Sequence, residues 1–200
     1  MIKPAQTLHP IHDLLANRWS PRAFDTNKKV SRAQIISMLE AARWAPSCFG
    51  DEPWRYIVWD KQSDLDAWEK AFACLGEANQ KWVKNAPLLF ASIANTLFDH
   101  NASENRWAQH DTGAASMALV LEAEALGLVA HQMGGFDAAK LRTAFFIPAT
   151  FTPMAMIAAG YQADAEILEG DYKTRELAAR SRKPMDSRFF EGAWGAAINK

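Results

Sequence analysis

Two arginines that flank a serine near the N-terminus are the residues best suited to bind an anion. They lie in the run Arg18-Trp19-Ser20-Pro21-Arg22, where the proline argues against a continued helix. In an extended segment alternate side chains point the same way, so Arg18, Ser20 and Arg22 would share one side. Two guanidinium groups beside a hydroxyl suit a phosphate, because their fork geometry matches its oxygens. The alternative is a pair of solvated arginines, which we favour when this motif is taken alone.

Residues 44–54 form a second candidate, because they are too apolar for an ordinary solvated connection. They carry two prolines, a glycine and three aromatic rings between a helix pattern and a strand pattern. Pro46 and Pro53 disfavour helical geometry in the residues before them, and Gly50 allows a backbone conformation that side chains resist. The segment could form a wall for a flat ligand or a loop that fills a gap in the core, and the sequence leaves both open.

A pair of glycines ends a short strand pattern that begins at residue 129. Gly134 and Gly135 expose backbone N–H groups without obstruction by side chains. A flat ligand could approach and accept hydrogen bonds there, although a plain tight turn would have the same sequence. His110 and Asp111 could be an acid/base pair, but adjacent residues on a helix point in different directions. We therefore favour structural polar roles for these two.

The signatures of several other chemistries are missing from the sequence. It contains no HExxH, CxxC, P-loop or GxGxxG motif and no G-x-S-x-G elbow. His9 and His12 lack an evident third ligand, so we expect no metal. Cys48 has no partner base that the sequence can assign, and we name no catalytic side chain.

The composition is that of an ordinary globular protein. With 200 residues, 49% hydrophobic and 22% charged, we expect one domain over residues 1–200. A net charge of -1 gives no bulk attraction to nucleic acid or anionic membrane, and no apolar run approaches bilayer-spanning length. The two cysteines form no CxxC pair and nothing at the N-terminus reads as a signal peptide, so the cytoplasm is the expected location.

Alternating helix and strand patterns would position these candidates. Strands are expected over 55–59, 88–94 and 154–161, and as a short segment from residue 129. Helices are expected after Pro10 up to Asn17, from a Ser31 cap to before Pro46, from a Ser63 cap to Gly76, over about 104–126, and after an Asp137 cap.

Two features indicate a second copy of the chain. The middle of the longest helix, residues 113–118, is built of small residues that permit close approach by another helix. Phe189, Phe190 and Trp194 place three large rings in a polar tail, where a partner subunit is the natural surface for them to pack on.

In their order along the chain, these weak signals resemble the nitroreductase family of FMN-dependent, NAD(P)H-using oxidoreductases. The motifs are Arg-x-Ser-x-Arg, an Ala-Pro-Ser loop ending in Pro-Trp, Ala-Asn-Gln before Ala-Pro, Gly-Gly-Phe-Asp and a late Arg-x-Arg-x-Pro. The resemblance runs from about His9 to Trp194. It implies an α+β, three-layer fold with a central, mostly antiparallel sheet flanked by helices, a long central dimer helix and an exchanged C-terminal segment.

The resemblance also assigns residues to the cofactor. The flavin phosphate and ribityl chain fall to residues from both ends of the chain, namely Arg18, Trp19, Ser20, Arg22, Arg180 and Arg182. Asn79 matches the family residue that hydrogen-bonds the pyrimidine edge of the ring. The segment beneath the ring is matched by Gln132, Met133, Gly134 and Gly135, with the Gly135 N–H toward the flavin N5.

A loop from the other subunit completes the site in the family, and its positions are matched by Pro46, Ser47, Cys48 and Gly50. The resemblance therefore implies a homodimer with two composite sites. Many members have Asn at the position of Gly50, and some have Glu at that of Gly134, which leaves the preference for NADH or NADPH open.

The implied reaction is a ping-pong transfer of hydride from NAD(P)H through flavin N5 to an electron-poor small molecule, of the nitroaromatic or quinone type. Two alternatives remain at this point. The same scaffold serves reductive dehalogenation and flavin destruction, and the chain could instead be a flavin-binding module or redox sensor with little turnover.

Overall fold

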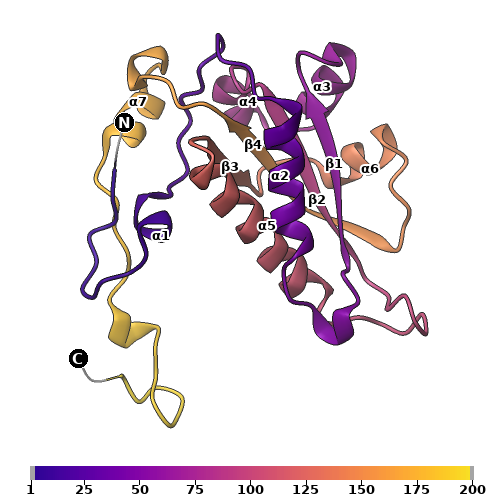
Figure 1. The fold of residues 1–200 in the computed structure, drawn as a ribbon, viewed down its shortest axis with the longest axis vertical. Coiled ribbons are helices and arrows are strands. Elements are labelled where there is room, and N and C mark those ends of the chain that lie inside the picture. The colour runs from indigo at the N-terminus through magenta and orange to yellow at the C-terminus, as the bar shows by residue number, and fades with distance from the viewer. Residues whose placement is uncertain (1–2, 199–200) are drawn as a thin grey trace.

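A four-stranded antiparallel sheet forms the centre of the computed structural model, which describes residues 3–198 (Figure 1). Its order is β1-β2-β4-β3, and the strands are Trp54–Asp60 (β1), Leu88–Asn95 (β2), Val129–Met133 (β3) and Phe151–Gly160 (β4). All three neighbouring pairs run antiparallel. Strand β2 is buried along its whole length, as its unbroken apolar sequence predicts for a central strand.

Helices cover both faces of this sheet and make three layers. Helices α2 (Arg32–Arg43) and α5 (Ala108–Ala125) pack on one face. Helices α3 (Leu65–Phe72), α4 (Glu77–Val83) and α6 (Ala138–Ala144) lie on the other. Because successive side chains of a strand alternate between faces, Phe90 joins the first core and Leu89 the second. The α+β, three-layer expectation is confirmed.

Most of the local start and stop signals have the expected form. Ser31 and Gln34 make a reciprocal capping box at the start of α2. Gly127, with φ +72°, follows the end of α5 in the left-handed region that favours glycine. Asp137 caps α6 by accepting the N–H of Lys140.

The N-terminal boundaries of two helices differ from the sequence-based expectation. Helix α3 is capped by Asp64, whose carboxylate accepts the N–H of Ala67. The Ser63 hydroxyl instead donates to the carboxylate of Asp60. Helix α5 starts at Ala108 and not near residue 104, because Glu104 pairs with Leu97 in an isolated β-bridge.

Helix α4 is an element that the hydrophobic pattern did not predict. Gly76, expected only to end the preceding helix, is the N-cap residue of α4, and its N–H donates to the carbonyl of Gly135. Seven residues give too short a periodic signal to recognise from sequence.

The two ends of the chain run side by side at the edge of the molecule (Figure 1). They include α1 (Asp13–Asn17) and α7 (Asp171–Leu177). Beyond α7 the tail leaves Phe189 and Trp194 exposed, the latter at 93%. Among residues 3–198 there is no helix with the length and apolar character needed to cross a bilayer.

Candidate functional site

Cationic side chains from both chain ends converge on one small cavity. Arg18, Arg180 and Arg182 line about 250 Å³ of space beside the apolar side chain of Met117 on α5. Burial lowers the pKa of Arg18, and the neighbouring charges of Arg180 and Arg182 lower it further. This cluster repels itself, and an anion placed in it would relieve the repulsion. We call the predicted phosphate-binding residues Arg18, Ser20, Arg22, Arg180 and Arg182 the anion clamp, of which the first and the last two line this cavity.

Arg180 joins the C-terminal segment to the N-terminal one through three backbone carbonyls. Its Nη1 donates to Lys3 O at 2.8 Å and to Ala16 O at 2.6 Å, while Nη2 donates to Arg18 O at 2.9 Å. Arg182, by contrast, is exposed and donates to the carbonyl of neighbouring Ser181. The first arginine is therefore structural as well as cationic, whereas the second keeps most of its guanidinium available.

The three expected clamp residues of the N-terminal segment do not all face the same group. Ser20 Oγ lies 3.5 Å from Arg18 Nη1, which places these two side chains together. The Arg22 guanidinium instead faces Glu176, with 3.9 Å between Nη1 and Oε2, and lies over the ring of Trp82. Trp19 is buried, and Lys3 Nζ lies 4.3 Å from the centre of its ring.

Asn79 and the glycine pair are brought together although they are far apart in sequence. Asn79 Nδ2 donates to Gly135 O at 2.9 Å, and a Cβ on Gly135 would lie 2.8 Å from that nitrogen. Only glycine fits at this position without displacing Asn79. Gly134 has open space where a Cβ would stand, and Gln132 is exposed. Met133 points into the core, so its contribution to a surface site is limited to its backbone.

His131 connects this glycine turn to the anion clamp. It lies on β3 directly before Gln132, and its Nδ1 is 2.9 Å from the carbonyl oxygen of Pro21. Burial is the main cause that lowers the pKa of His131 to about 4, so the ring is neutral near pH 7. Because a carbonyl can only accept, Nδ1 must carry the proton. Sequence reasoning did not select His131, whose only signal was its place beside the glycine motif.

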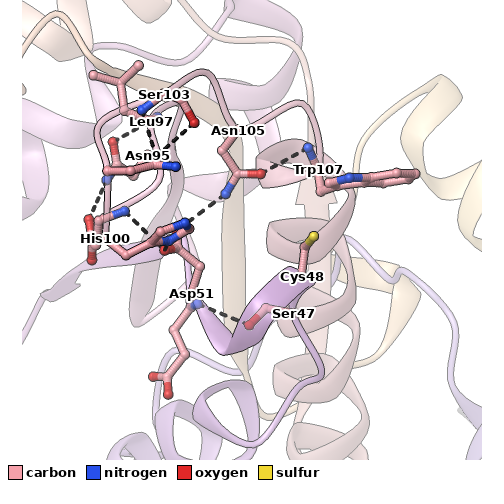
Figure 2. Close-up of polar contacts among 12 residues, drawn as sticks. Ser47, Cys48, Asp51, Asn95, Leu97, His100, Ser103, Asn105 and Trp107 are labelled. Carbon is pink, nitrogen blue, oxygen red and sulfur yellow. Dashed lines mark hydrogen bonds and ion pairs between the residues drawn. The ribbon is translucent and has the colours of Figure 1, made fainter.

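The loop formed by residues 46–52 has a backbone fixed by side chains from α5 and from the loop itself. Cys48 N–H donates to Asp111 Oδ2 at 2.9 Å, and Glu52 N–H donates to Ser47 Oγ at 3.0 Å. Figure 2 shows Asp51 among polar contacts with residues 95–105, where its carboxylate accepts from Asn105 Nδ2 at 3.3 Å. The role of Asp111 is thus structural, as favoured from the sequence, and its partner is the loop backbone.

Strained backbone geometry gives this loop its shape. Phe49 and Glu52 adopt φ values of 57° and 48°, which side-chain-bearing residues rarely do, and Gly50 lies between them at 67°. The Phe49 ring is 85% exposed and borders a cavity of about 750 Å³ that Arg55 and His100 also line. Of the two readings left open by the sequence, the exposed wall fits this arrangement, although Trp54 at the end of the run is buried.

Within one chain this wall does not meet the glycine turn. The loop precedes β1 and the turn follows β3, and these strands are opposite edges of the sheet. Three strand spacings separate them, or about 14 Å. Pro46, Ser47, Cys48 and Gly50 are therefore not brought to the glycine turn by a single copy.

The family model described as the nitroreductase family matches residues 15–161. The chain belongs to the nitroreductase family. As a member, it is an oxidoreductase enzyme. The sequence resemblance is thereby confirmed, while the individual site residues stay predictions.

Known relatives agree with this assignment. A crystal structure of an oxidoreductase containing FMN superposes with a TM-score of 0.89 at 34% identity, covering 96% of each chain. The major NAD(P)H-flavin oxidoreductase of Aliivibrio fischeri is 33% identical over 86 residues, which are 42% of this chain and 39% of that protein. An uncharacterised 15.4 kDa protein of Mycolicibacterium smegmatis is 30% identical over 70% of this chain and 97% of its own length.

Proposed function

We propose that this nitroreductase-family protein is an FMN-dependent oxidoreductase that passes hydride from NAD(P)H to an electron-poor acceptor, of the nitroaromatic or quinone type. The observation that carries the proposal is the convergence of Arg18, Arg180 and Arg182 on one cavity, with His131 linking that region to the glycine turn. The FMN-containing relative adds support.

The residues present fit the two ends of FMN. A phosphate dianion suits the self-repelling cations of the anion clamp, and the Ser20 hydroxyl adds a donor beside Arg18. A flat, hydrogen-bonding ring suits Asn79 and Gly135, because the open space at Gly134 leaves backbone groups accessible. Trp19, Gln132 and Met133 complete the proposed set of cofactor-binding residues.

When bound, FMN would supply the redox chemistry by accepting hydride at N5 from NAD(P)H and releasing it to the acceptor, with the two substrates entering in turn. The protein's own part is to bind and orient. A backbone N–H at Gly135 would donate toward the ring and favour negative charge there. No protein side chain is assigned as acid or base.

We also propose that the active form is a homodimer, in which Pro46, Ser47, Cys48 and Gly50 of each copy complete the site of the other. Support comes from the separation of this loop and the glycine turn across the sheet, and from the exposed rings of Phe189 and Trp194. Light scattering of the purified protein tests this directly, since a monomeric mass with full activity would contradict it.

The whole chain is proposed to act as one flavin-binding domain. We propose a cytoplasmic location with it, supported by two cysteines, Cys48 and Cys74, that are unpaired in the described structure.

The decisive experiment starts from the visible spectrum of the purified protein. A flavin spectrum is expected, and denaturation should release FMN. Anaerobic mixing with NADH and with NADPH should bleach that spectrum, after which a panel of nitroaromatics and quinones should restore it. A colourless protein to which FMN cannot be restored, or a flavin that both nucleotides leave oxidised, would contradict the proposal.

A further inference from the structure

Glu176 is a completely buried carboxylate that the site described above does not use. It lies on α7 with 0% of its surface exposed. A carboxylate is rarely found in such a place unless hydrogen bonds or an opposite charge compensate for the loss of water. Its partners therefore indicate why it is there.

Those partners belong to the N-terminal segment of the anion clamp, more than 150 residues earlier in the chain. The Arg22 N–H donates to both carboxylate oxygens, at 2.9 Å to Oε1 and 3.0 Å to Oε2. The Ala23 N–H donates to Oε1 at 3.2 Å, and the Arg22 guanidinium lies 3.9 Å from Oε2. A charged acceptor makes these bonds stronger than bonds between neutral groups.

The opposite end of the same peptide group is held by His131. The carbonyl of Pro21 and the N–H of Arg22 form one peptide unit, and Nδ1 of His131 contacts that carbonyl at 2.9 Å. Two side chains, the partly buried His131 of β3 and the buried Glu176 of α7, therefore fix the plane of the Pro21–Arg22 peptide. We call this arrangement the peptide grip.

The groups that apply the grip are themselves fixed. Helix α7 is tied to the region of Asn79, because Tyr172 Oη donates to Ala78 O at 2.8 Å. His131 packs against the ring of Trp82, with 4.6 Å between ring centres. The grip thus connects the anion clamp to the glycine turn and to Asn79. In the proposed function the clamp binds the phosphate end of the ligand, and the glycine turn and Asn79 bind the ring at its other end.

We propose that Glu176 and His131 are positioning residues for phosphate recognition. They orient the Pro21–Arg22 peptide, and thereby the neighbouring Ser20 beside Arg18, for a phosphate group without touching it. This inference rests on the proposed FMN site. It distinguishes a carboxylate that merely stabilises the fold from one that sets the geometry of a particular contact.

Riboflavin provides the test, because it has the ring and ribityl chain of FMN but no phosphate. Affinities of both flavins for the full-length apoprotein are measured by fluorescence titration for wild type, Glu176→Ala and Glu176→Gln. Glu176→Ala should weaken FMN binding by about tenfold, equivalent to about 1.4 kcal/mol, and change riboflavin binding by less than about twofold. Glu176→Gln keeps an oxygen acceptor for the two N–H groups and should recover FMN affinity to within about threefold of wild type.

His131→Phe is the second variant, needed in case Glu176→Ala does not fold. It keeps an aromatic ring against Trp82 but removes the donor to Pro21, and the same selective loss of FMN affinity is expected. The matched control is Glu166→Ala, which removes an exposed carboxylate that pairs with Lys173 at 2.7 Å in the same C-terminal segment. It should leave both affinities unchanged.

Equal weakening of both flavins, or no weakening of either, in Glu176→Ala or His131→Phe would overturn the inference, as would a Glu176→Gln protein no better than Glu176→Ala. Wild-type protein that binds neither flavin would instead overturn the proposed function, and the inference with it.

Discussion

The anion clamp and the loop of residues 46–52 are both irregular segments with a fixed backbone, but different interactions fix them. Each is an irregular segment whose backbone N–H groups donate to a buried carboxylate, Glu176 for the clamp and Asp111 for the loop. The clamp is surrounded by cations and is held from both chain ends. The loop carries exposed rings and unfavourable φ values instead. Charged hydrogen bonds and ion pairs thus hold the backbone of the clamp, whereas unfavourable backbone angles give the loop of residues 46–52 its shape.

The sharpest test of this difference compares the two carboxylates. Removing Glu176 leaves two backbone N–H groups without an acceptor and the Arg22 charge without its partner. Glu176→Ala should therefore lower the free energy of unfolding by about 3–5 kcal/mol. Asp111 serves one loop N–H and the exposed His110, so Asp111→Ala should lower it by only about 1–2 kcal/mol. Urea unfolding measures both, and equal losses would show that the two anchors are equivalent.

The pH dependence of stability should reside in the clamp region. His131 has its pKa lowered to about 4 from 6.5 by burial first and by the charges of Arg22 and Arg18 as well. The unfolded chain therefore binds the extra proton first, and stability present above pH 6.5 is lost as the pH falls toward 4. The loss should reach about 3 kcal/mol in wild type.

His131→Gln is the control for that effect, because it retains a donor for Pro21 and does not titrate. Its unfolding free energy should be flatter between pH 4 and 6.5 than that of wild type. An unchanged profile would assign the pH dependence to other groups.

Arg180 tests whether the clamp needs the shape of an arginine or only its charge. Arg180→Ala leaves three carbonyls without their donor and should cost about 2 kcal/mol, reduced by the partial access of water. Arg180→Lys keeps the charge but loses the planar fork, so about half of that loss should remain. Thermal unfolding of the two variants gives the comparison, and full recovery by lysine would show that charge alone suffices.

The smallest effect on stability is expected in the loop of residues 46–52, where a substitution at Gly50 changes only the preferred backbone angles. Gly50→Ala meets no neighbouring atom within 4 Å, yet it must adopt φ 67° and should cost about 1 kcal/mol. Gly50→Asn should cost less, because asparagine tolerates this conformation. Neither difference should respond to salt, in contrast to the clamp variants. If the loss of stability in the Gly50 variants changed with salt concentration, the two regions would not differ in the way described.

Much of the fold followed from the sequence because its signals are local. The unbroken apolar run of β2 predicted a central strand, and the capping box at Ser31 predicted the start of α2. Helix α4 and the true cap of α3 were missed, because a short helix has little periodicity and adjacent Ser63 and Asp64 compete for one role.

The candidate site was predictable only as a set of residue types. Arg18 and Gly135 were selected for their own chemistry, whereas Arg180 and Asn79 were assigned through the family resemblance. His131 and Glu176 were not selected, since a lone histidine in a strand and a lone glutamate in a tail have no pattern around them.

The amino-acid sequence by itself determined most of the helices and strands and the glycines and arginines available for binding, since these depend on residue type and on spacing within a few turns of chain. The family and its layered α+β fold followed from the order of motifs along nearly the whole chain. Only the tertiary structure decided which of these residues meet. It turned Arg22 toward Glu176, joined His131 to Pro21, and put the 46–52 loop across the sheet from the glycine turn. Those outcomes depend on contacts between residues more than a hundred positions apart and on strand order, which no local pattern encodes.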